Sequence, residues 1–209
     1  MKLLILGSTG KVGQLLVAQA LEQGHEVTAF LRTPAKLSLR HAHLGVIVGD
    51  ARDGHMIAAA MIGQDAIISA LGHNSARKTD VLTAATHAIL ANLTDRQRVI
   101  SLTGYGVADP HDPKPTLGGR LQNELIRRIP GEMSLDGERH ADLLRQSHAQ
   151  WVLVRAPRMS GGPITHDYRT GYFPVKLSTT VSRADVADFM LFNLTSNEWL
   201  GQAPLVAAR

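Results

Sequence analysis

The chain has 209 residues, of which 44% are hydrophobic and 19% are charged, and its formal net charge is +4. This composition is that of a folded protein and argues against a disordered chain, and the length predicts a single domain spanning residues 1–209. Because the chain has no cysteine it excludes disulfides and thiolate metal ligands, and because it has no apolar run long enough to span a membrane we expect a cytoplasmic protein with no membrane partner.

Short apolar runs alternate along the chain with stretches whose apolar residues recur every three or four positions. The runs are expected to be buried strands and cover residues 2–6, 26–31, 46–48, 66–69, 99–102 and 151–155. Helices are expected around residues 12–20, 81–93 and 141–147, and a capping box at 182–185 predicts the start of another. Strands that are apolar throughout are typical of a parallel sheet covered on both faces. The alternation therefore predicts an α/β fold with a Rossmann-like, doubly wound parallel sheet.

Two segments, near residues 104–134 and 157–180, break this alternation with prolines and glycines. Each follows an expected strand, and in an open parallel sheet the ligand crevice lies beyond the carboxyl ends of the strands. We therefore expect both segments to be irregular loops that form walls of a substrate site. The alternative is that they are ordinary surface loops.

A glycine-rich sequence, Gly-Ser-Thr-Gly-Lys-Val-Gly at residues 7–13, lies between the first expected strand and the first expected helix. At such a junction, backbone N–H groups and the helix N-terminus can bind a diphosphate. Gly7 permits a tight turn, Gly10 lets a ligand approach the backbone, and Gly13 lets the helix pack on the strand. A glycine-rich turn without a ligand is the alternative.

The end of the second strand indicates which dinucleotide is preferred. An acidic residue there would bind a ribose 2′-hydroxyl, but the chain has Arg32 and, four residues later, Lys36. These two cations suit a 2′-phosphate and predict NADP(H) as the cofactor, with a solvated basic turn as the alternative. Asp50, after the third strand, is placed to meet the adenine, and the fourth strand ends at Leu71 and Gly72, where a small residue would let the cofactor pass.

The chain resembles the NAD(P)H-binding, NmrA-like atypical short-chain reductases, of the biliverdin reductase B and flavin reductase type. The resemblance rests on the glycine-rich motif, on Val-Gly-Asp at 48–50, on Val-Arg-Ala-Pro at 154–157 and on Ser-Arg-Ala-Asp-Val-Ala at 182–187. It implies NADPH-dependent hydride transfer to a flavin, a quinone or a similar planar conjugated acceptor. It also implies a role in cofactor binding for Gly7, Thr9, Gly10, Lys11, Val12, Gly13, Arg32, Lys36, Asp50, Leu71 and Gly72.

The catalytic half of the resemblance is weaker. Short-chain reductases usually place a Ser or Thr after the fifth strand and a Tyr-x-x-x-Lys pair on the next helix, so that a phenol can donate the proton. Thr103 stands at the expected strand end, but the pair is missing from the helix. The sequence Tyr172-Phe-Pro-Val-Lys176 matches the pattern, although Pro174 excludes the helix that would align the two side chains.

The remaining site residues are therefore expected to supply proximity rather than a dedicated acid. We expect Thr103 to lie near the nicotinamide, Tyr105 to form part of the acceptor pocket, and Arg158 to bind an anionic acceptor such as a flavin phosphate. His140 is a candidate proton donor, but a single histidine on a helix is more often structural. Thr103 as a plain strand end and Arg158 as a surface charge are the corresponding alternatives.

Other functional classes fit the sequence less well. The histidines do not form metal-ligand spacings with carboxylates, so no metal is predicted, and scattered cations with 4% aromatic residues argue against a nucleic-acid partner. A non-catalytic NADP(H)-binding redox sensor of the NmrA-like type remains an alternative, because the usual proton donor is missing. A nucleotide-sugar epimerase is disfavoured for the same reason. We expect a monomer or a homodimer.

Overall fold

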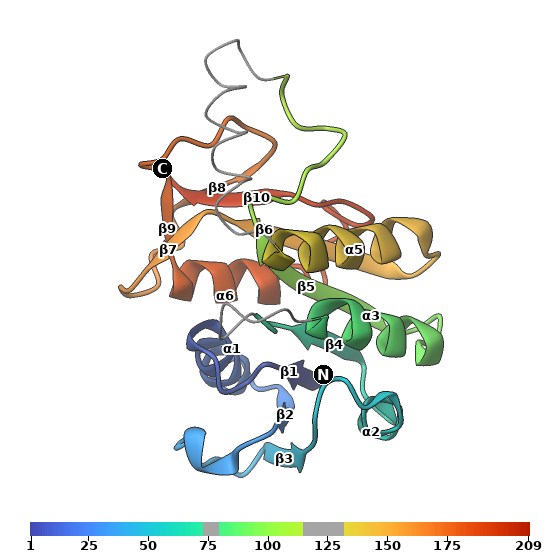
Figure 1. Ribbon diagram of the computed structural model, residues 1–209. Coiled ribbons are helices and arrows are strands. Elements are labelled where there is room, and N and C mark those ends of the chain that lie inside the picture. The colour runs from blue at the N-terminus through green and yellow to red at the C-terminus, as the bar shows by residue number, and fades with distance from the viewer. Residues whose placement is uncertain (73–79, 115–131) are drawn as a thin grey trace.

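The computed structural model describes residues 1–72, 80–114 and 132–209 (Figure 1). Its main sheet has eight strands in the order β3-β2-β1-β4-β5-β6-β10-β8. These strands are β1 (Lys2–Leu6), β2 (Glu26–Leu31), β3 (Leu44–Val48), β4 (Ala66–Ser69), β5 (Arg98–Gly104), β6 (Gln150–Ala156), β8 (Tyr168–Gly171) and β10 (Leu205–Ala208). All neighbours pair in parallel except β8, which is antiparallel to β10.

Helices cover both faces of this sheet (Figure 1). The described helices are α1 (Lys11–Glu22), α2 (Gly54–Met61), α3 (Val81–Asn92), α5 (Glu132–Gln146) and α6 (Arg183–Phe192), with a 3₁₀ turn, η1 (Pro34–Lys36). Helices α1 and α6 pack together on one face, and α2, α3 and α5 lie on the other. A separate pair of parallel strands, β7 (Arg158–Ser160) and β9 (Thr180–Ser182), lies beside the main sheet.

The alternation of side chains along β1 explains why both faces need a cover. Leu3 and Ile5 enter the apolar cluster formed with α1 and α6, whereas Leu4 and Leu6 enter the cluster formed with α2, α3 and α5. All four side chains are fully buried. Since successive side chains of a strand point to opposite faces, an uninterrupted apolar run can be buried only between two layers.

The strand order reverses direction next to β1, and this determines where a ligand can bind. The chain first adds β2 and β3 on one side of β1 and then places β4 on the other side. The two crossovers leave the sheet in opposite directions, so their loops separate at the carboxyl ends of β1 and β4 and leave a crevice there. The glycine-rich sequence directly follows β1 at this point.

The sequence-based expectations for the fold are confirmed in their main features and corrected in several details. All six expected strands are present, and the Rossmann-like sheet is as predicted. The segment 157–180 is less irregular than expected, because it contains β7, β8 and the first residue of β9. Helix α5 begins at Glu132, well before the expected 141, so the end of the 104–134 segment is helical. Residues 115–131 of that segment lie outside the described residues.

Among the described residues, no helix has both the length and the apolar character that a membrane crossing requires.

Candidate functional site

The glycine-rich loop has the backbone geometry that its sequence predicts. Gly7 has a φ angle of +76°, in the left-handed region that favours glycine. A Cβ atom on Gly7 would also lie 2.5 Å from the carbonyl oxygen of Ala70, at the end of β4. The loop is therefore pressed directly against the neighbouring strand, and a larger residue at this position would push the two apart.

Gly13 has a different reason to be glycine. Its Cβ atom would lie 2.1 Å from the Gly7 carbonyl oxygen, so the first turn of α1 packs against the loop with no room for a side chain. The loop itself closes through a hydrogen bond from the Gly10 N–H to the Gly7 carbonyl, 2.9 Å long. Gly10 is the N-cap of α1 and contributes no capping side chain, and the first turn of the helix has no acidic residue. The N–H groups of the first turn of α1, at residues 11–13, and the positive end of the helix dipole suit an external anion.

Two hydrogen-bonding side chains connect the region of the glycine-rich loop to β2 and to the basic turn that follows it. The buried Ser8 hydroxyl donates to the Phe30 carbonyl at 3.2 Å. The Gln14 side-chain amide donates to the carbonyls of Thr9, at 3.1 Å, and of Lys36, at 3.4 Å. Sequence reasoning missed Ser8 and Gln14, since neither belongs to the glycine pattern.

These contacts bring the two halves of the predicted cofactor site together. Arg32 and Lys36 are both exposed and lie on the turn that Gln14 links to the loop. Of the other predicted residues, Thr9 and Lys11 lie at the solvent-facing end of the loop, whereas the Val12 side chain is buried and offers only its backbone.

The residues predicted for adenosine lie at the same edge of the sheet. Asp50 follows β3, and its carboxylate accepts the Arg52 N–H at 3.0 Å, which holds the turn in place. Leu71 and Gly72 follow β4, whose end is aligned with β1 by a hydrogen bond from the Ala70 N–H to the Leu6 carbonyl. A Cβ atom on Gly72 would meet nothing within 4 Å, so the surface beside the loop is open there.

The acceptor side is built around the end of β5. Thr103 lies at this strand end and is only 7% exposed. A Cβ atom on Gly137, in α5, would lie 3.2 Å from the Thr103 hydroxyl oxygen and 3.0 Å from Val107. A larger side chain at position 137 would therefore crowd Thr103. Tyr105 follows in a turn, partly exposed, and its burial raises the pKa of the phenol, so the hydroxyl keeps its proton at neutral pH.

Arg158 is exposed at the start of β7 and pairs through its backbone with β9. It belongs to the outer strand pair and not to the buried strand β6 that precedes it. The side chain of Arg158 is therefore a solvent-exposed cation on the outer strand pair.

His140 is enclosed in the protein interior, which argues against its role as a proton donor. Its ring is 1% exposed, with Nδ1 2.6 Å from the Thr86 hydroxyl and Nε2 3.1 Å from the Ser101 hydroxyl. Burial lowers the pKa of His140 to about 4, although the Asp136 carboxylate partly opposes this effect. The neutral ring links α3, α5 and β5, and both of its nitrogens lie within hydrogen-bond distance of a hydroxyl group. Because the ring is enclosed away from solvent, a structural role fits His140 better than the role of proton donor.

The Tyr-x-x-x-Lys sequence at 172–176 is not helical, as Pro174 predicts. The Tyr172 hydroxyl instead accepts the Ala203 N–H at 3.1 Å, and its ring lies against His111 with a centroid distance of 5.1 Å. The residue has a structural role between β8 and β10.

Arg155 organises the loop after β5, a role that sequence reasoning missed. Although it lies in β6, it is 1% exposed, and its guanidinium binds both carboxylate oxygens of Asp112 at 2.5 and 2.8 Å. It also donates to the carbonyls of Val107, at 2.8 Å, and Ala203, at 2.7 Å. An arginine inside an otherwise apolar strand is a signal that could have pointed to such a buried clamp.

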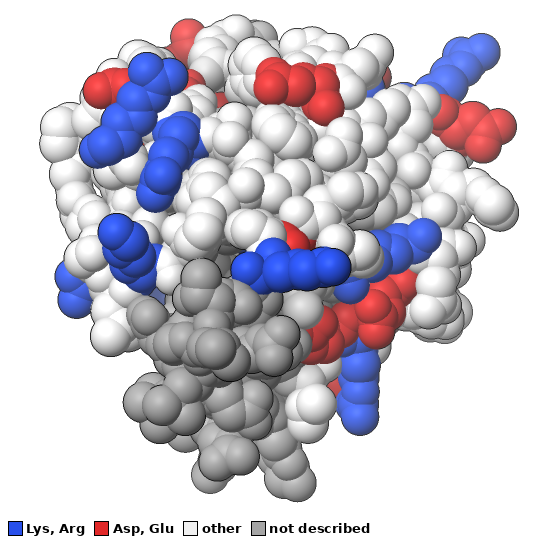
Figure 2. All heavy atoms as spheres, turned by 90° about the horizontal axis from the view of Figure 1, so that it is seen from above, with Lys and Arg blue, Asp and Glu red and all other residues white. Residues whose placement is uncertain are grey.

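Charge is distributed without a single dominant patch on the face shown in Figure 2, where lysines and arginines are spread out and acidic residues lie between them. Among the described residues, no group of three or more His, Asp or Glu side chains is positioned to hold a metal ion.

Comparison with known proteins adds a family to this geometry. A family model described as NAD(P)H-binding matches residues 7–197, from the first glycine of the loop to the segment after α6. The chain belongs to this NAD(P)H-binding family. The match confirms the resemblance drawn from the motifs. It also agrees with the fit of a dinucleotide to the loop, since the glycine contacts, the uncapped helix end and the adjacent cations all lie within the matched range.

Curated relatives of the NAD(P)H-binding chain match only part of it. A 3-beta-hydroxysteroid dehydrogenase from Mycolicibacterium neoaurum is 42% identical over 66 residues, which is 32% of this chain and 18% of that protein. A photosystem II assembly factor from Synechocystis is 33% identical over 84 residues, which is 40% of this chain and 25% of that protein. The matches thus span a quarter or less of these relatives.

Solved structures match over the whole chain. A Streptococcus pneumoniae protein proposed to be an NADH-flavin reductase has a TM-score of 0.78 at 20% identity and covers 100% of both chains. An anaerobillin reductase from Escherichia coli has a TM-score of 0.78 at 21% identity, over 99% of this chain and 96% of that one. A short-chain dehydrogenase/reductase from Veillonella parvula, in complex with NADP, has a TM-score of 0.77 at 17% identity, over 98% and 93%. These likenesses confirm the fold.

Proposed function

We propose that this protein is an NADPH-dependent reductase that transfers hydride to a small planar conjugated acceptor such as a flavin or a quinone. The proposal rests on one observation: Gln14 of α1 bridges Thr9 of the glycine-rich loop and Lys36 of the turn that bears Arg32, while Ser8 of the loop hydrogen-bonds to Phe30 near the end of β2. A diphosphate at the loop would therefore have a 2′-phosphate site of two cations beside it.

The bound nicotinamide would supply the hydride, and the residues of this chain would hold and orient the reactants. Backbone N–H groups of residues 11–13, in the first turn of α1, would bind the diphosphate, while Arg32 and Lys36 would bind the 2′-phosphate. Thr103 and Tyr105, at the end of β5, would border the reacting ring. Because Tyr105 keeps its proton at neutral pH, it can donate a hydrogen bond to an acceptor oxygen or nitrogen.

The proton that completes the reduction would come from water. A flavin or quinone can be protonated from solvent after hydride transfer, so the chain does not need the missing tyrosine–lysine pair. Arg158, which is exposed at the start of β7, would attract an anionic acceptor such as a flavin phosphate. The names of the Streptococcus and Escherichia neighbours, which refer to flavin and anaerobillin, agree with a flat acceptor.

The proposal is tested by titrating the purified protein with NADPH and NADH, and then measuring nucleotide oxidation with FMN, FAD, a quinone and a linear tetrapyrrole. We expect tighter binding of NADPH and sustained turnover with at least one acceptor. Equal affinity for the two nucleotides would contradict the assignment of Arg32 and Lys36 to the 2′-phosphate. Failure to bind either nucleotide would contradict the whole proposal.

A non-catalytic NADP(H) sensor is the second candidate. It is favoured by the enclosure of His140 and by the absence of a side chain at Gly137, the position that faces Thr103. Tight NADPH binding with no oxidation by any acceptor in the panel would select the sensor over the reductase.

A further inference from the structure

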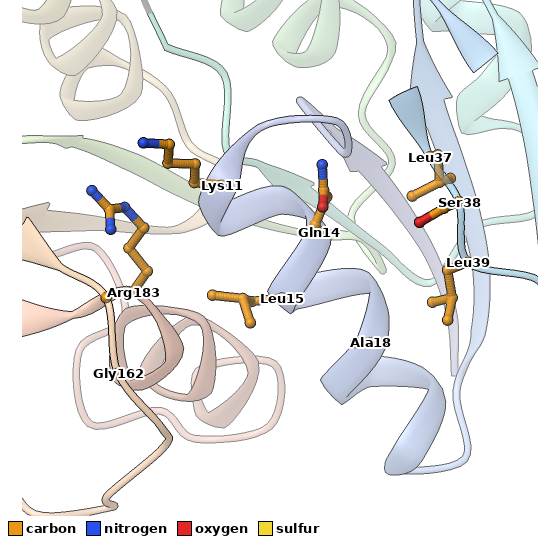
Figure 3. A pocket seen from close by; sticks show the side chains of 10 residues that line it. Lys11, Gln14, Leu15, Ala18, Leu37, Ser38, Leu39, Gly162 and Arg183 are labelled. Atoms are coloured by element: carbon orange, nitrogen blue, oxygen red, sulfur yellow. The ribbon is translucent and has the colours of Figure 1, made fainter. Parts of the chain in front are cut away.

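A groove of about 480 Å³ lies along the outer face of α1 (Figure 3). It begins at Lys11, next to the glycine-rich loop, and extends along the helix to Ala18. Helix α1 forms the floor, residues 37–39 form one wall, and Gly161 and Gly162 form part of the other. The groove therefore starts beside the candidate cofactor site but runs away from it.

The wall at residues 37–39 is fixed in place by side chains. Leu37 is buried in a small cluster with Ala29 and Leu31 of β2. The Arg40 guanidinium donates to the carbonyls of Leu37, at 2.8 Å, and of Leu39, at 3.0 Å. These contacts hold a segment that has no helix or strand of its own.

The opposite wall is held from α6. The buried Asp185 carboxylate accepts the N–H groups of Thr165, at 2.7 Å, and His166, at 3.2 Å. Gly162, just before them, has a φ angle of +132°, and its Cβ atom would lie 3.9 Å from the Ser182 side chain. Because both walls are fixed by contacts within the protein, the groove does not need a ligand to form.

The lining of the groove is mainly apolar, with the neutral polar side chains of Gln14 and Ser38 among its residues, and it is positively charged at one end. Leu15 and Ala18 present a partly exposed apolar floor, and Lys11 and Arg183 lie at the same end (Figure 3). No residue lining the groove is acidic. Within the described ranges, neither cation forms an ion pair with a carboxylate. Two uncompensated positive charges beside an apolar channel complement a negatively charged head on an apolar body.

We propose that this groove binds a small anionic amphiphile, such as a medium-chain fatty acid, with its head at Lys11 and Arg183 and its chain over Leu15 and Ala18. The volume lies within the range of about 300 to 1,000 Å³ that small-molecule pockets occupy. A neutral amphiphile of the same length would gain the apolar contacts but not the attraction of the two cations.

The site would also be linked to the cofactor, and this part of the inference rests on the proposed function. Lys11 belongs both to the groove and to the glycine-rich loop, so an anionic head beside it would compete with the cofactor diphosphate for the same charge. Such coupling acts equally in both directions. The amphiphile should therefore weaken NADPH binding, and NADPH should weaken amphiphile binding by the same factor.

The first experiment is a calorimetric titration of the nucleotide-free protein with decanoate, below its micelle concentration, and with decanol. We expect saturable decanoate binding at least about fivefold tighter than decanol binding. Ala18→Phe, which fills the groove, should weaken decanoate at least about tenfold. Arg183→Gln should remove most of the preference for decanoate over decanol, while Arg96→Gln, an exposed arginine outside the groove, should change neither.

Several results would overturn the inference. Decanoate binding that Ala18→Phe leaves unchanged would show that the ligand binds elsewhere. Equal affinities for decanoate and decanol would show that the negatively charged head does not contribute to binding. Dimerisation that Ala18→Phe abolishes, without decanoate binding, would assign the groove to a second copy of the chain. Circular dichroism of each variant checks the fold. NADPH is titrated separately, so that loss of nucleotide binding counts against the proposed function and absence of decanoate binding against the groove.

Discussion

Single residues after β2 are proposed to determine whether the protein binds NADPH or NADH more tightly. Replacing Arg32 by aspartate removes a cation and adds a negative charge where the 2′-phosphate would lie. We expect the affinity for NADPH to fall at least about tenfold, because charge-assisted hydrogen bonds to a phosphate are lost, and the affinity for NADH to change much less. Fluorescence titration of both nucleotides measures this ratio. Arg96→Asp, at an exposed position elsewhere, is the control, and equal losses for the two nucleotides would contradict the assignment.

Gly13 shows how one residue can determine the shape of the loop. In Gly13→Ala the new Cβ atom would lie 2.1 Å from the Gly7 carbonyl oxygen, so the loop and α1 must move apart. We expect the free energy of unfolding to fall by about 1 to 3 kcal/mol and dinucleotide binding to be lost.

The matched control for this prediction is Gly54→Ala at the start of α2, where the new Cβ atom would meet only the Ala88 Cβ, at 3.6 Å. An alanine in a helix is intrinsically favourable, so this variant should be as stable as the parent or slightly more stable. Urea unfolding of both variants makes the comparison. If Gly13→Ala were also neutral, the close packing of loop and helix would be wrong.

The clamp around Arg155 acts on whole elements, since it joins the loop after β5 to β6 and to the segment before β10. In Asp112→Asn the guanidinium keeps its backbone acceptors but loses its carboxylate partner. We expect the loop after β5 to loosen, which should raise the KM for the acceptor several-fold. The affinity for NADPH should stay unchanged, because the glycine-rich loop follows a different strand, β1.

Steady-state kinetics with one acceptor, together with NADPH titration, separates these two effects. Asp142→Asn, which removes an exposed carboxylate from its contact with Arg145, is the control and should change neither quantity. A parallel loss of NADPH affinity in Asp112→Asn would mean that the contacts of Arg155 support the whole fold and not only the loop after β5.

Elements with strong local patterns could be predicted from the sequence, and those that depend on distant partners could not. The six buried strands and the glycine-rich turn follow from runs of neighbouring residues. Helix α2, in contrast, has only eight residues, too few for the recurring apolar positions that predicted the longer helices. Strands β8 and β10 are defined by pairing with each other and with β6, which no local pattern records.

The same distinction holds within the candidate site. The glycines and the cations of the basic turn are recognisable because loop shape and charge require particular residue types. The bridging roles of Ser8 and Gln14 depend on carbonyls 22 positions away in the chain, and Ser and Gln are common residues elsewhere. The environment of His140 was likewise hidden, because its partners Thr86 and Ser101 come from other elements.

At the scale of the whole molecule, His140 links stability to pH. The folded protein holds its ring neutral, with a pKa of about 4, whereas in the unfolded chain the ring regains its ordinary pKa of 6.5. Above pH 6.5 both states are neutral and the full contribution to stability is present. As the pH falls below 6.5, the ring becomes protonated in the unfolded chain, whereas in the folded protein it stays neutral until about pH 4. The group therefore removes stability progressively between these two values.

This linkage predicts that the free energy of unfolding falls between pH 6.5 and pH 4 by about 3 kcal/mol through this residue alone, at about 1.4 kcal/mol for each tenfold change in proton affinity. Carboxylates also titrate toward the lower end of this range, so the test is a difference between variants. His140→Gln retains hydrogen-bonding capacity toward Thr86 and Ser101 but cannot bind the proton, and its stability should depend less on pH across this window. His87→Gln, at an exposed position on α3, should keep the slope of the parent. Urea unfolding at a series of pH values decides the matter, since identical slopes for His140→Gln and the parent would show that the buried ring does not resist protonation.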